Sequence, residues 1–480
     1  MTATLLRLAG LVALSLAGLA PASTSRAADD ICVECLEVRV GPPTVIRGPF
    51  PDELDAAFSA LKLPDGSFRG FSANGSTYAI DGPTLWDMRG ERLEVLQAGS
   101  KGSRSDCGRW LTSTVRTDDA LLGFVHQEHD CDYNAGRTDK SQAIARSIDD
   151  GLTWTDLGTV ITGPDAPAPD QTTGEGDCTM VDGRDGYLYG YCLRNSDWQT
   201  IVTRAPVEQP TEWRKYFNGE FTEPGLSGKA SAIGFVGIGT GYLKEPGWVA
   251  AVATDPWFGG LRLSLSQDKV TFIDIPQPLL PVDGSDWSRP APTDLVAYTT
   301  LLNPEDGSNA IDWHFLLAYV YVPINKGFES RYLVFHEVTL SRLDGPHAGP
   351  VGAALMRWRD GDSTITSTGP LTGDRGRYQR DAMLAYMLTS DSKTMPTRKI
   401  VECTSDGSGR LDQVLAEDGG CAAEGYVQER TAGWLYTEEA PGTVPIYRCR
   451  TEAGLHFAST AAGCEGRGSD ASLLGYGLAS

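Results

Sequence analysis

The sequence predicts an all-β chain in two parts. The first is a five-bladed β-propeller over residues 37–343, and the second is a smaller, three-unit, β-trefoil-like domain over residues 352–480. Three observations support this fold class. Strand-like hairpins recur with a period of about 60 residues, and no segment has the pattern of a long amphipathic helix. The pattern then changes after a Gly/Pro-rich linker at 344–351.

The propeller prediction depends on a hairpin that returns along the chain. Residues 141–147 (SQAIARS) alternate like a strand, DDG makes a turn, and LTWTDL continues as the next strand. Similar segments begin at Thr200 and Gly260, and related hairpins lie at 75–88 and 332–343. A period near 60 residues holds about four short strands, the content of one propeller blade. Such periods fill the chain as far as the linker.

The segment 147–154, SIDDGLTW, resembles the Asp-box that recurs in sialidases and other β-propeller proteins, and a shortened version spans 266–272. In this interpretation Asp149 caps turn amides through its carboxylate, and Trp154 packs between sheets. The box therefore predicts the fold and not the chemistry.

Three shorter units follow the linker, each opening and closing on a similar strand. The openings are 354–360, 398–404 and 445–451, and the closings are 383–388, 423–428 and 473–479. We expect Arg359 in unit one to replace the first cysteine of the later units. Unit three resembles an uncharacterised repeat (xYRxY…GxHFxT/S…GY) found on many secreted bacterial proteins. That resemblance implies an appendage that binds surfaces or glycans.

The N-terminus predicts export. Arg7 precedes an apolar run, Leu8 to Ala20, and Ser25-Arg26-Ala27 follows as a small-x-small cleavage site. Because the run is too short to span a bilayer, residues 1–27 are predicted to be a secretory signal peptide. The mature chain is then secreted, extracellular or periplasmic, with no membrane span.

The net negative charge of the chain limits the kinds of partner that it can bind. The formal net charge is −22, and loss of Arg7 and Arg26 with the signal peptide makes it −24. Such a chain is repelled by nucleic acid and by anionic lipid, which argues against both as partners. We expect a monomer.

The ten cysteines fall in pairs, and an even number in an exported chain predicts disulfides. The expected pairs are Cys107 with Cys131, Cys178 with Cys192, Cys403 with Cys421, and Cys449 with Cys464. Cys32 and Cys35 form a lone CxxC, whose pairing the sequence leaves open. A redox or zinc role for it has no second CxxC and no βαβ context to support it.

Two of these cysteines locate carboxylates at strand entries. Asp106-Cys107 and Asp177-Cys178 occupy equivalent positions in adjacent blades, and alternation puts Glu175 and Asp177 on one strand face. If that face looks toward the axis, three carboxylates gather at one mouth of the channel. Hydrolysis of a glycosidic bond needs two of them, one protonated and one ionised. The alternative is that GEGD is an acidic turn and that Asp106 caps a turn.

The run GRWL…LLGFVHQEH…SQAIARSIDDGLTW…GEGDCTMV…YLYGYC, within residues 65–345, resembles secreted five-bladed propellers of the glycoside-hydrolase type. These are akin to arabinanases, xylosidases and invertases. That group uses an Asp base, an Asp that tunes the pKa and a Glu acid, each from a different blade. The resemblance implies that Glu175 is the acid, that Asp106 is the base and that Asp177 tunes the pKa of the acid. Glu175 and Asp177 share a blade here, which departs from the group's layout.

The resemblance implies a neutral oligo- or polysaccharide substrate. The rival hypothesis is a non-catalytic propeller that binds glycan or a cell surface. A sialidase-like protein comes third, because the chain lacks an Arg-Ile-Pro motif and a recognisable arginine triad.

Substrate contacts are expected from Arg109, Trp110, His126 and Glu128. In HQEH, His126 and Glu128 share a strand face while His129 points to the other, so the segment is not expected to chelate a metal as one unit. Trp110, Trp198 and Trp257 could stack on sugar rings, although core packing is the commoner use of a tryptophan. We expect that no cofactor is required, and a structural calcium ion is compatible with the sequence.

Overall fold

The computed structural model describes residues 31–49, 51–52, 54–254, 260–283, 287–344, 349–405, 411–423 and 425–480. The signal peptide prediction, Trp257 and linker residues 345–348 lie outside them. In the described ranges the regular structure is almost entirely strand, and the α-helix is the four-residue α1 (Gly420–Ala423). The all-β prediction is confirmed. No helix in those ranges is long and apolar enough to cross a membrane.

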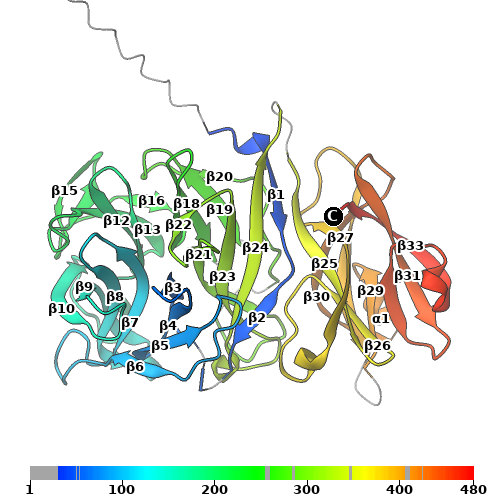
Figure 1. Ribbon diagram of the computed structural model, residues 1–480, viewed down its shortest axis with the longest axis horizontal. Helices are drawn as coiled ribbons and strands as arrows, with labels where there is room; N and C mark the ends of the chain where they lie inside the picture. Colours follow the sequence, from blue (N-terminus) through cyan, green and yellow to red (C-terminus); the bar gives the residue numbers. More distant parts are fainter. Residues whose placement is uncertain are drawn as a thin grey trace, which may run out of the picture. The chain divides into compact units, whose positions relative to one another are not determined.

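Antiparallel groups of strands follow one another along the chain, each meandering outward from an inner strand (Figure 1). The first group is β3 (Ser59–Lys62), β4 (Phe68–Asn74), β5 (Ser76–Gly82) and β6 (Leu93–Leu96). The second is β7 (Gly108–Arg116), β8 (Leu121–Asp132), β9 (Arg137–Ser147) and β10 (Thr155–Thr162). The third is β11 (Thr172–Asp182), β12 (Tyr187–Arg194), β13 (Gln199–Pro206), β14 (Arg214–Phe217) and β15 (Glu220–Pro224), with β16 (Ala232–Gly234) beside β13.

The next group is β17 (Gly239–Leu243), β18 (Trp248–Ala253), β19 (Arg262–Ser266) and β20 (Ile273–Asp274), with β22 (Ala310–Ile311) beside β17. The group after it is β21 (Leu295–Leu302), β23 (His314–Val322) and β24 (Tyr332–Arg342). It is completed by the start of the chain, because β1 (Leu36–Val40) and β2 (Thr44–Arg47) both pair with β24. The chain therefore closes on its own N-terminal strands.

The inner strands form a ring. β3, β7, β11, β17 and β21 contact one another in turn, and β21 returns to β3. Their middles surround a cavity of about 10 Å³, which is lined mainly by hydroxyl side chains. Each inner strand supplies at least one of them, among which are Ser59, Ser113, Thr179, Thr240 and Thr300. Small side chains fit this narrow axis, whereas the larger side chains of the same strands pack between neighbouring groups.

Those cores join each group to the next. Phe71 of β4 packs with Leu111 of β7, and Phe124 of β8 packs with Met180 of β11. Trp154 lies against the Phe71 ring at 5.8 Å between centroids, so its expected place between sheets is confirmed. Burial of such side chains, about 1.5–3 kcal/mol each, stabilises the ring of sheets.

The turn that holds Asp149 has the expected geometry. Its carboxylate accepts hydrogen bonds from the Thr153 backbone N–H at 2.9 Å, the Thr153 hydroxyl at 2.6 Å and the Ser147 hydroxyl at 2.7 Å. Asp268 does the same in the shortened segment, where it accepts from the Thr271 N–H and from Ser266. Both carboxylates therefore form these hydrogen bonds within their own turns.

The C-terminal strands come in triplets. They are β25 (Val351–Asp360), β26 (Ser363–Ser367) and β27 (Gln379–Leu388); β28 (Thr397–Ser405), β29 (Gln413–Glu417) and β30 (Tyr426–Tyr436); and β31 (Thr443–Thr451), β32 (His456–Ser459) and β33 (Gly468–Leu478). In each triplet the first strand pairs with both others. The third strands β27, β30 and β33 pair with one another.

Matching β-bulges correct one prediction about these triplets. The register shifts directly after Leu355 in β25, after Ile400 in β28 and after Ile446 in β31. Counting from these bulges, Trp358 stands where the later triplets have their first cysteine. The expectation that Arg359 takes this place is wrong by one residue, because the sequence alone does not show where the strand is bulged.

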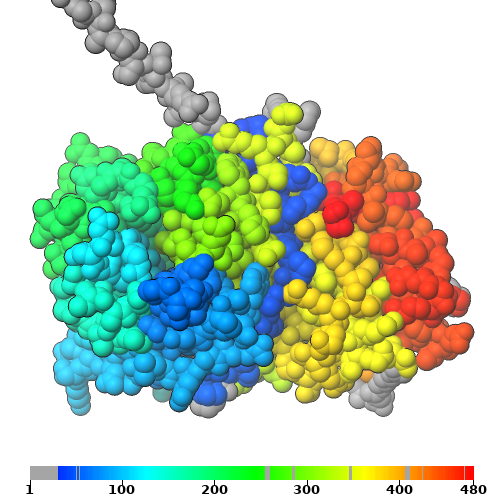
Figure 2. Space-filling model, in the orientation of Figure 1, coloured from blue at the N-terminus to red at the C-terminus, as the bar shows by residue number. Residues whose placement is uncertain are grey.

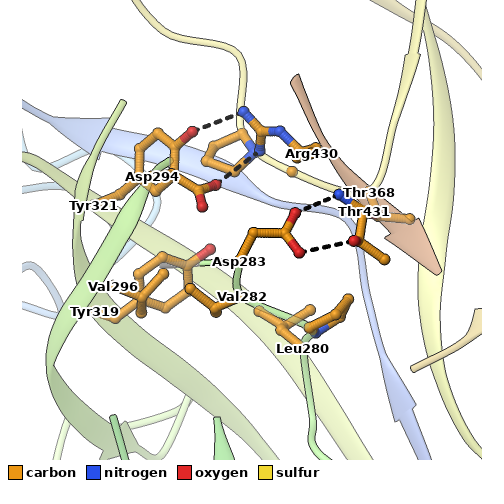
Figure 3. A pocket seen from close by; sticks show the side chains of 13 residues that line it. Leu280, Val282, Asp283, Asp294, Val296, Tyr319, Tyr321, Thr368, Arg430 and Thr431 are labelled. Atoms are coloured by element: carbon orange, nitrogen blue, oxygen red, sulfur yellow. Dashed lines mark hydrogen bonds and ion pairs between the residues drawn. The ribbon is translucent and has the colours of Figure 1, made fainter. Parts of the chain in front are cut away.

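Strand pairing and side-chain contacts both join the C-terminal strands to the ring. β1 pairs in parallel with β25 on the side away from β24, and Figure 2 shows this blue segment between yellow-green and yellow ones. Nearby, Asp283 accepts from the Thr431 N–H at 2.6 Å and its hydroxyl at 2.8 Å (Figure 3). Arg430 reaches Tyr321 and Asp294. The cavity there is about 30 Å³, room for one or two waters, so it is an interface and not a ligand site.

The disulfides of the ring agree with the prediction and complete it. Cys107, which directly precedes β7, pairs with Cys131 of β8, and Cys178 of β11 pairs with Cys192 of β12. Each bridge therefore joins two neighbouring strands of one group, as expected. The pairing that the sequence left open is also present, because Cys32 is bonded to Cys35.

The disulfides of the C-terminal triplets are the two that were expected. Cys403 of β28 is bonded to Cys421 of α1, and Cys449 of β31 is bonded to Cys464, which begins a short 3-10 helix. In each case the first strand of the triplet is tied to the segment that leads into the third strand. All four sulfur-bearing side chains are buried, so the bridges are part of the packed core of their triplets.

Candidate functional site

Three carboxylates gather where the inner strands begin, at a site we call the channel mouth. Asp55 lies four residues before β3, Asp177 lies on β11, and Glu128 of β8 stands opposite Gly108 at the start of β7. Each comes from a different strand group. Two of them, Glu128 and Asp177, are among the residues singled out from the sequence. Asp55 is not, and its position just before a buried strand is the signal that could have found it.

Lys140 of β9 holds two of these carboxylates. Its Nζ lies 2.7 Å from Asp177 Oδ2 and 3.7 Å from Glu128 Oε1. Burial alone would raise the pKa of Asp177, but the adjacent ammonium charge lowers it below its usual value. The same balance keeps the pKa of Lys140 above its usual value. Both carboxylates are therefore ionised at neutral pH.

His126 ties the same two carboxylates together. Its Nδ1 accepts a hydrogen bond of 2.9 Å from the backbone N–H of Asp177, so the ring proton must sit on Nε2. Nε2–H then donates to Glu128 Oε1 at 3.1 Å. The indole of Trp110 packs against this imidazole, with centroids 5.4 Å apart. The neutral tautomer is thus fixed by the fold.

The other oxygen of Glu128 is bound by Tyr133, whose hydroxyl donates to Oε2 at 2.6 Å. Burial opposes ionisation, but hydrogen bonds from His126 and Tyr133 and the charge of Lys140 lower the pKa of Glu128 to about 2. Tyr133 is itself 63% exposed, so its ring is open to solvent while its hydroxyl is fixed. Its turn is anchored beside the Cys131 disulfide.

Asp55 has a different environment. Arg331 lies 3.0 Å from its Oδ1, and the Tyr298 hydroxyl donates to the same oxygen at 3.4 Å. Burial in the mouth and the negative charges of Glu128 and Asp177 raise the pKa of Asp55, although Arg331 opposes them. Its side chain is 33% exposed, the most open of the three carboxylates. Asp55 is the one carboxylate of the three whose pKa is raised.

A bulge separates Asp177 from Glu175. Asp177 has φ +50°, and the β11–β12 register shifts between Gly176 and Thr179. Glu175 consequently turns the other way and lies 2.6 Å from Lys215 of β14, with both side chains fully buried. The expectation that Glu175 and Asp177 share one face is wrong, because strict alternation fails at a bulge. Burial raises the pKa of Glu175 and lowers that of Lys215.

Asp106 also stays out of the mouth cluster. Its Oδ2 accepts from the Gly102 N–H at 2.8 Å, which is the turn-capping alternative. Arg109 pairs with Asp156 at 3.0 Å, and Trp110 is buried at 5% exposure. The predicted meeting of Asp106 with Glu175 across the channel is therefore not found. Asp106 is bound within its own turn, and Glu175 is paired with Lys215 in the interior.

The segment HQEH behaves as its strand position predicts. His126 and Glu128 contact each other, whereas the ring of His129 lies 3.2 Å from the Asp139 carbonyl. Across the described ranges no cluster of three or more His, Cys, Asp or Glu is arranged to hold a metal ion. The structural calcium ion stays a prediction. Trp198 is partly exposed, at 43%.

Solved structures similar to this chain include three carbohydrate-active enzymes. A family 117 glycoside hydrolase of Zobellia galactanivorans has TM-score 0.44 and 10% identity, covering 66% of this chain and 94% of its own. An α-L-arabinanase of Penicillium chrysogenum has TM-score 0.36 and 13% identity, with 62% and 98% covered. A GH62 α-L-arabinofuranosidase domain of Coprinopsis cinerea has TM-score 0.38 and 12% identity, with 63% and 96% covered. No family model matches the sequence, and no curated protein matches it.

Proposed function

We propose that this chain is a secreted glycoside hydrolase that acts on a neutral oligo- or polysaccharide at the channel mouth. In this proposal the strand groups are the blades of a five-bladed propeller, and the C-terminal triplets are a pseudo-threefold, trefoil-like domain. The observation that carries the activity is the carboxylate trio. Asp55 has a raised pKa, while Glu128 and Asp177 have lowered ones.

The trio has the composition that the sequence resemblance implies, although with different members. Two aspartates and one glutamate come from three different strand groups. Asp55 and Glu128 replace the expected Asp106 and Glu175. The departure noted in the sequence, with two acidic residues in one blade, is removed because Glu175 belongs to a buried ion pair.

The proposed role of each carboxylate follows from which of its oxygen atoms is free of a hydrogen-bond partner. Both oxygens of Glu128 are engaged, by His126 and Tyr133, so Glu128 is a positioning residue. Asp177 Oδ2 is bound to Lys140, while Oδ1 has no hydrogen-bond donor within reach in the described ranges. Asp177 Oδ1 is thus available to accept a proton from water. Asp55 supplies the proton that a leaving group needs.

The proposed step is a single displacement. Asp55 donates its proton to the glycosidic oxygen as the bond from that oxygen to the anomeric carbon breaks. Water attacks the anomeric carbon from the opposite face and gives its proton to Asp177, which inverts the configuration. Water from solvent returns the charges to their starting state by moving the proton from Asp177 to Asp55.

A neutral substrate fits the charges at the mouth. Lys140 offsets Asp177 and Glu128, and Arg331 offsets Asp55. The mouth thus has no surplus cation with which to bind an acidic sugar. The exposed ring of Tyr133 offers an apolar face of the kind on which sugars stack.

One observation favours the rival function, a non-catalytic glycan-binding propeller. Lys140 binds the Asp177 carboxylate at 2.7 Å, and this ammonium charge would weaken Asp177 as a base. The same fixed donors and acceptors could serve recognition of sugar hydroxyls alone.

The test is turnover of aryl glycosides of neutral sugars and of plant and microbial polysaccharides, followed by reducing-end release and NMR of the first anomer formed. We expect Asp55→Asn and Asp177→Asn each to lower kcat by about 10²–10⁴-fold. Asp360→Asn, the same change at the exposed Asp360–Arg377 pair of the C-terminal strands, should leave kcat unchanged. Glycan binding without any turnover would establish the rival function instead.

A further inference from the structure

A second hollow lies at the opposite end of the channel. Four basic residues lie at or just beyond the ends of inner strands. Lys62 and Arg116 are the last residues of β3 and β7, and Arg184 and Lys244 follow the ends of β11 and β17. All four residues line a single cavity, so these strands run in the same direction. Since the carboxylate trio lies where the strands begin, this cavity is at the far end of the ring. We call it the far cavity.

Its size is that of a ligand site. The cavity volume is about 380 Å³, within the range of about 300–1,000 Å³ that small-molecule sites occupy. It shares Ala60, Thr114 and Asn309 with the hydroxyl-lined cavity on the axis. The channel mouth and the far cavity are therefore the two ends of one axis.

Its cations are balanced rather than free. Arg116 pairs with Asp150 at 2.5 Å, and Lys244 pairs with Asp312 at 2.6 Å. Arg184 lies 3.4 Å from Asp182, which itself lines the cavity.

Asp306 is the fourth aspartate, and its backbone carbonyl accepts from the Lys62 N–H at 2.8 Å. Of these carboxylates only Asp182 and Asp306 line the cavity, but with Asp150 and Asp312, which pair with two of its cations, four carboxylates match the four cations. A free anion would meet as much repulsion as attraction, and an apolar ligand would strip water from charged groups.

The polar lining matches a hydroxylated neutral ligand. A sugar hydroxyl donates one hydrogen bond and accepts two, so it can bridge a guanidinium and a carboxylate that already face each other. Ser308 and Asn309 add uncharged polar side chains, and Tyr242 supplies a half-buried aromatic ring in the same lining. Donors, acceptors and one ring therefore converge from the ends of several strands.

We propose that the far cavity is a second saccharide-binding site, which takes one neutral sugar unit and is separate from the channel mouth. It does not depend on the proposed hydrolysis, because its residues lie at the other ends of the strands. In a protein that acts on a polymer, such a site retains the chain near the surface. In a protein that only binds glycans, it adds a second point of attachment.

The test is saturation-transfer NMR titration with methyl β-D-galactoside, methyl β-D-xyloside and methyl α-L-arabinofuranoside, with phosphate and glucuronate as anionic probes. The cavity variant is Arg184→Met/Lys244→Met, whose side chains are exposed and whose loss the fold tolerates. The matched control is Arg398→Met/Lys399→Met, a half-buried Arg/Lys pair that also has carboxylate partners. Each titration is repeated with Tyr133→Ala, which removes the exposed ring at the mouth.

We expect at least one neutral glycoside to bind, to lose at least tenfold in affinity in the cavity variant, and to keep that affinity in the control and with Tyr133→Ala. Binding that disappears with Tyr133→Ala but survives in the cavity variant would overturn the inference and leave the proposed function intact. Binding of phosphate or glucuronate alone would also overturn it. Cavity binding without hydrolysis of any substrate would uphold the inference while the proposed function fails.

Discussion

Two lysine–carboxylate pairs start from carboxylates two residues apart on β11 and differ in nearly every physical respect. At the mouth, Asp177 and Lys140 lie 2.7 Å apart, keep 11% and 16% of their side chains exposed and share Glu128 and His126 as neighbours. In the interior, Glu175 and Lys215 lie 2.6 Å apart with no exposure at all. Lys215 also donates to the carbonyl of Thr162, at the end of β10, and to that of Gly228.

The difference shows in the pKa values. Burial would raise the pKa of Asp177, but the charge and the hydrogen bond of Lys140 outweigh it and lower that pKa. That of Glu175 is raised, because burial is complete and one lysine does not offset it. A carboxylate between two strands of a core can therefore look catalytic in sequence while it serves packing and loop attachment. Both pairs contain a carboxylate and a lysine, but the mouth pair keeps some contact with solvent and the interior pair has none.

The largest expected effect comes from breaking the interior pair. Lys215→Met leaves Glu175 buried without a counter-ion and should lower the free energy of unfolding by about 3–5 kcal/mol. Glu175→Gln in the same chain should recover most of that loss. Lys140→Met, whose partners keep some water, should cost only about 1–2 kcal/mol. Urea unfolding followed by tryptophan fluorescence measures all of these, and an equal cost at both lysines would refute the comparison.

The pH dependence of stability should have opposite signs for Glu128, which lies beside the mouth pair, and for Glu175 of the interior pair. Glu128, with a pKa of about 2, stabilises the fold above its unfolded pKa of about 4.3 and loses this contribution as pH falls through 2. The loss amounts to about 3 kcal/mol, and Glu128→Gln should remove it. Glu175 has a raised pKa, so its contribution is lost as pH rises through that value.

Unfolding of the wild type and the two variants, Glu128→Gln and Glu175→Gln, between pH 2 and 8 measures this difference. We expect Glu128→Gln to flatten the acid side and Glu175→Gln to flatten the side near neutrality. An acid side that is unchanged in Glu128→Gln would show that the mouth network does not hold that carboxylate ionised.

Several features of this comparison were readable from the sequence. The all-β class, four disulfides, the capping role of Asp149 and the shared face of His126 with Glu128 follow from alternation, cysteine number and turn chemistry. These are local properties of strands and turns, which a sequence pattern reports directly.

The membership of the mouth cluster did not follow from the pattern. A bulge at Asp177 breaks the alternation that placed Glu175 beside it, and nothing near Glu175 in the sequence announces Lys215, 40 residues later. Asp55 meets Asp177 only because β3 and β11 lie in one closed ring. Such long-range contacts depend on register and closure, which single residues do not encode.

A smaller effect is expected from the hydroxyl that binds Glu128. Tyr133→Phe keeps the ring but removes the 2.6 Å hydrogen bond, so the pKa of Glu128 should rise and the unfolding free energy should fall by about 1.5 kcal/mol. Carboxyl NMR titration measures the shift. Tyr78→Phe, whose ring lies under Arg92, is the control and should leave that pKa where it is. A Glu128 titration that does not move in Tyr133→Phe would contradict the network.

The smallest effect should come from a third kind of carboxylate, one held by its own turn without a lysine. Asp149→Ala removes the acceptor for the Thr153 N–H and both nearby hydroxyls, and by analogy with helix caps it should cost about 1 kcal/mol. Asp268→Ala, in the matching turn, should cost a similar amount. Neither change reaches the mouth, so kcat on any substrate turned over should stay at the wild-type value in folded protein. Thermal unfolding together with kinetics on the folded fraction checks both, and loss of catalysis in well-folded Asp149→Ala would move the active site to the outer turns of the strand groups.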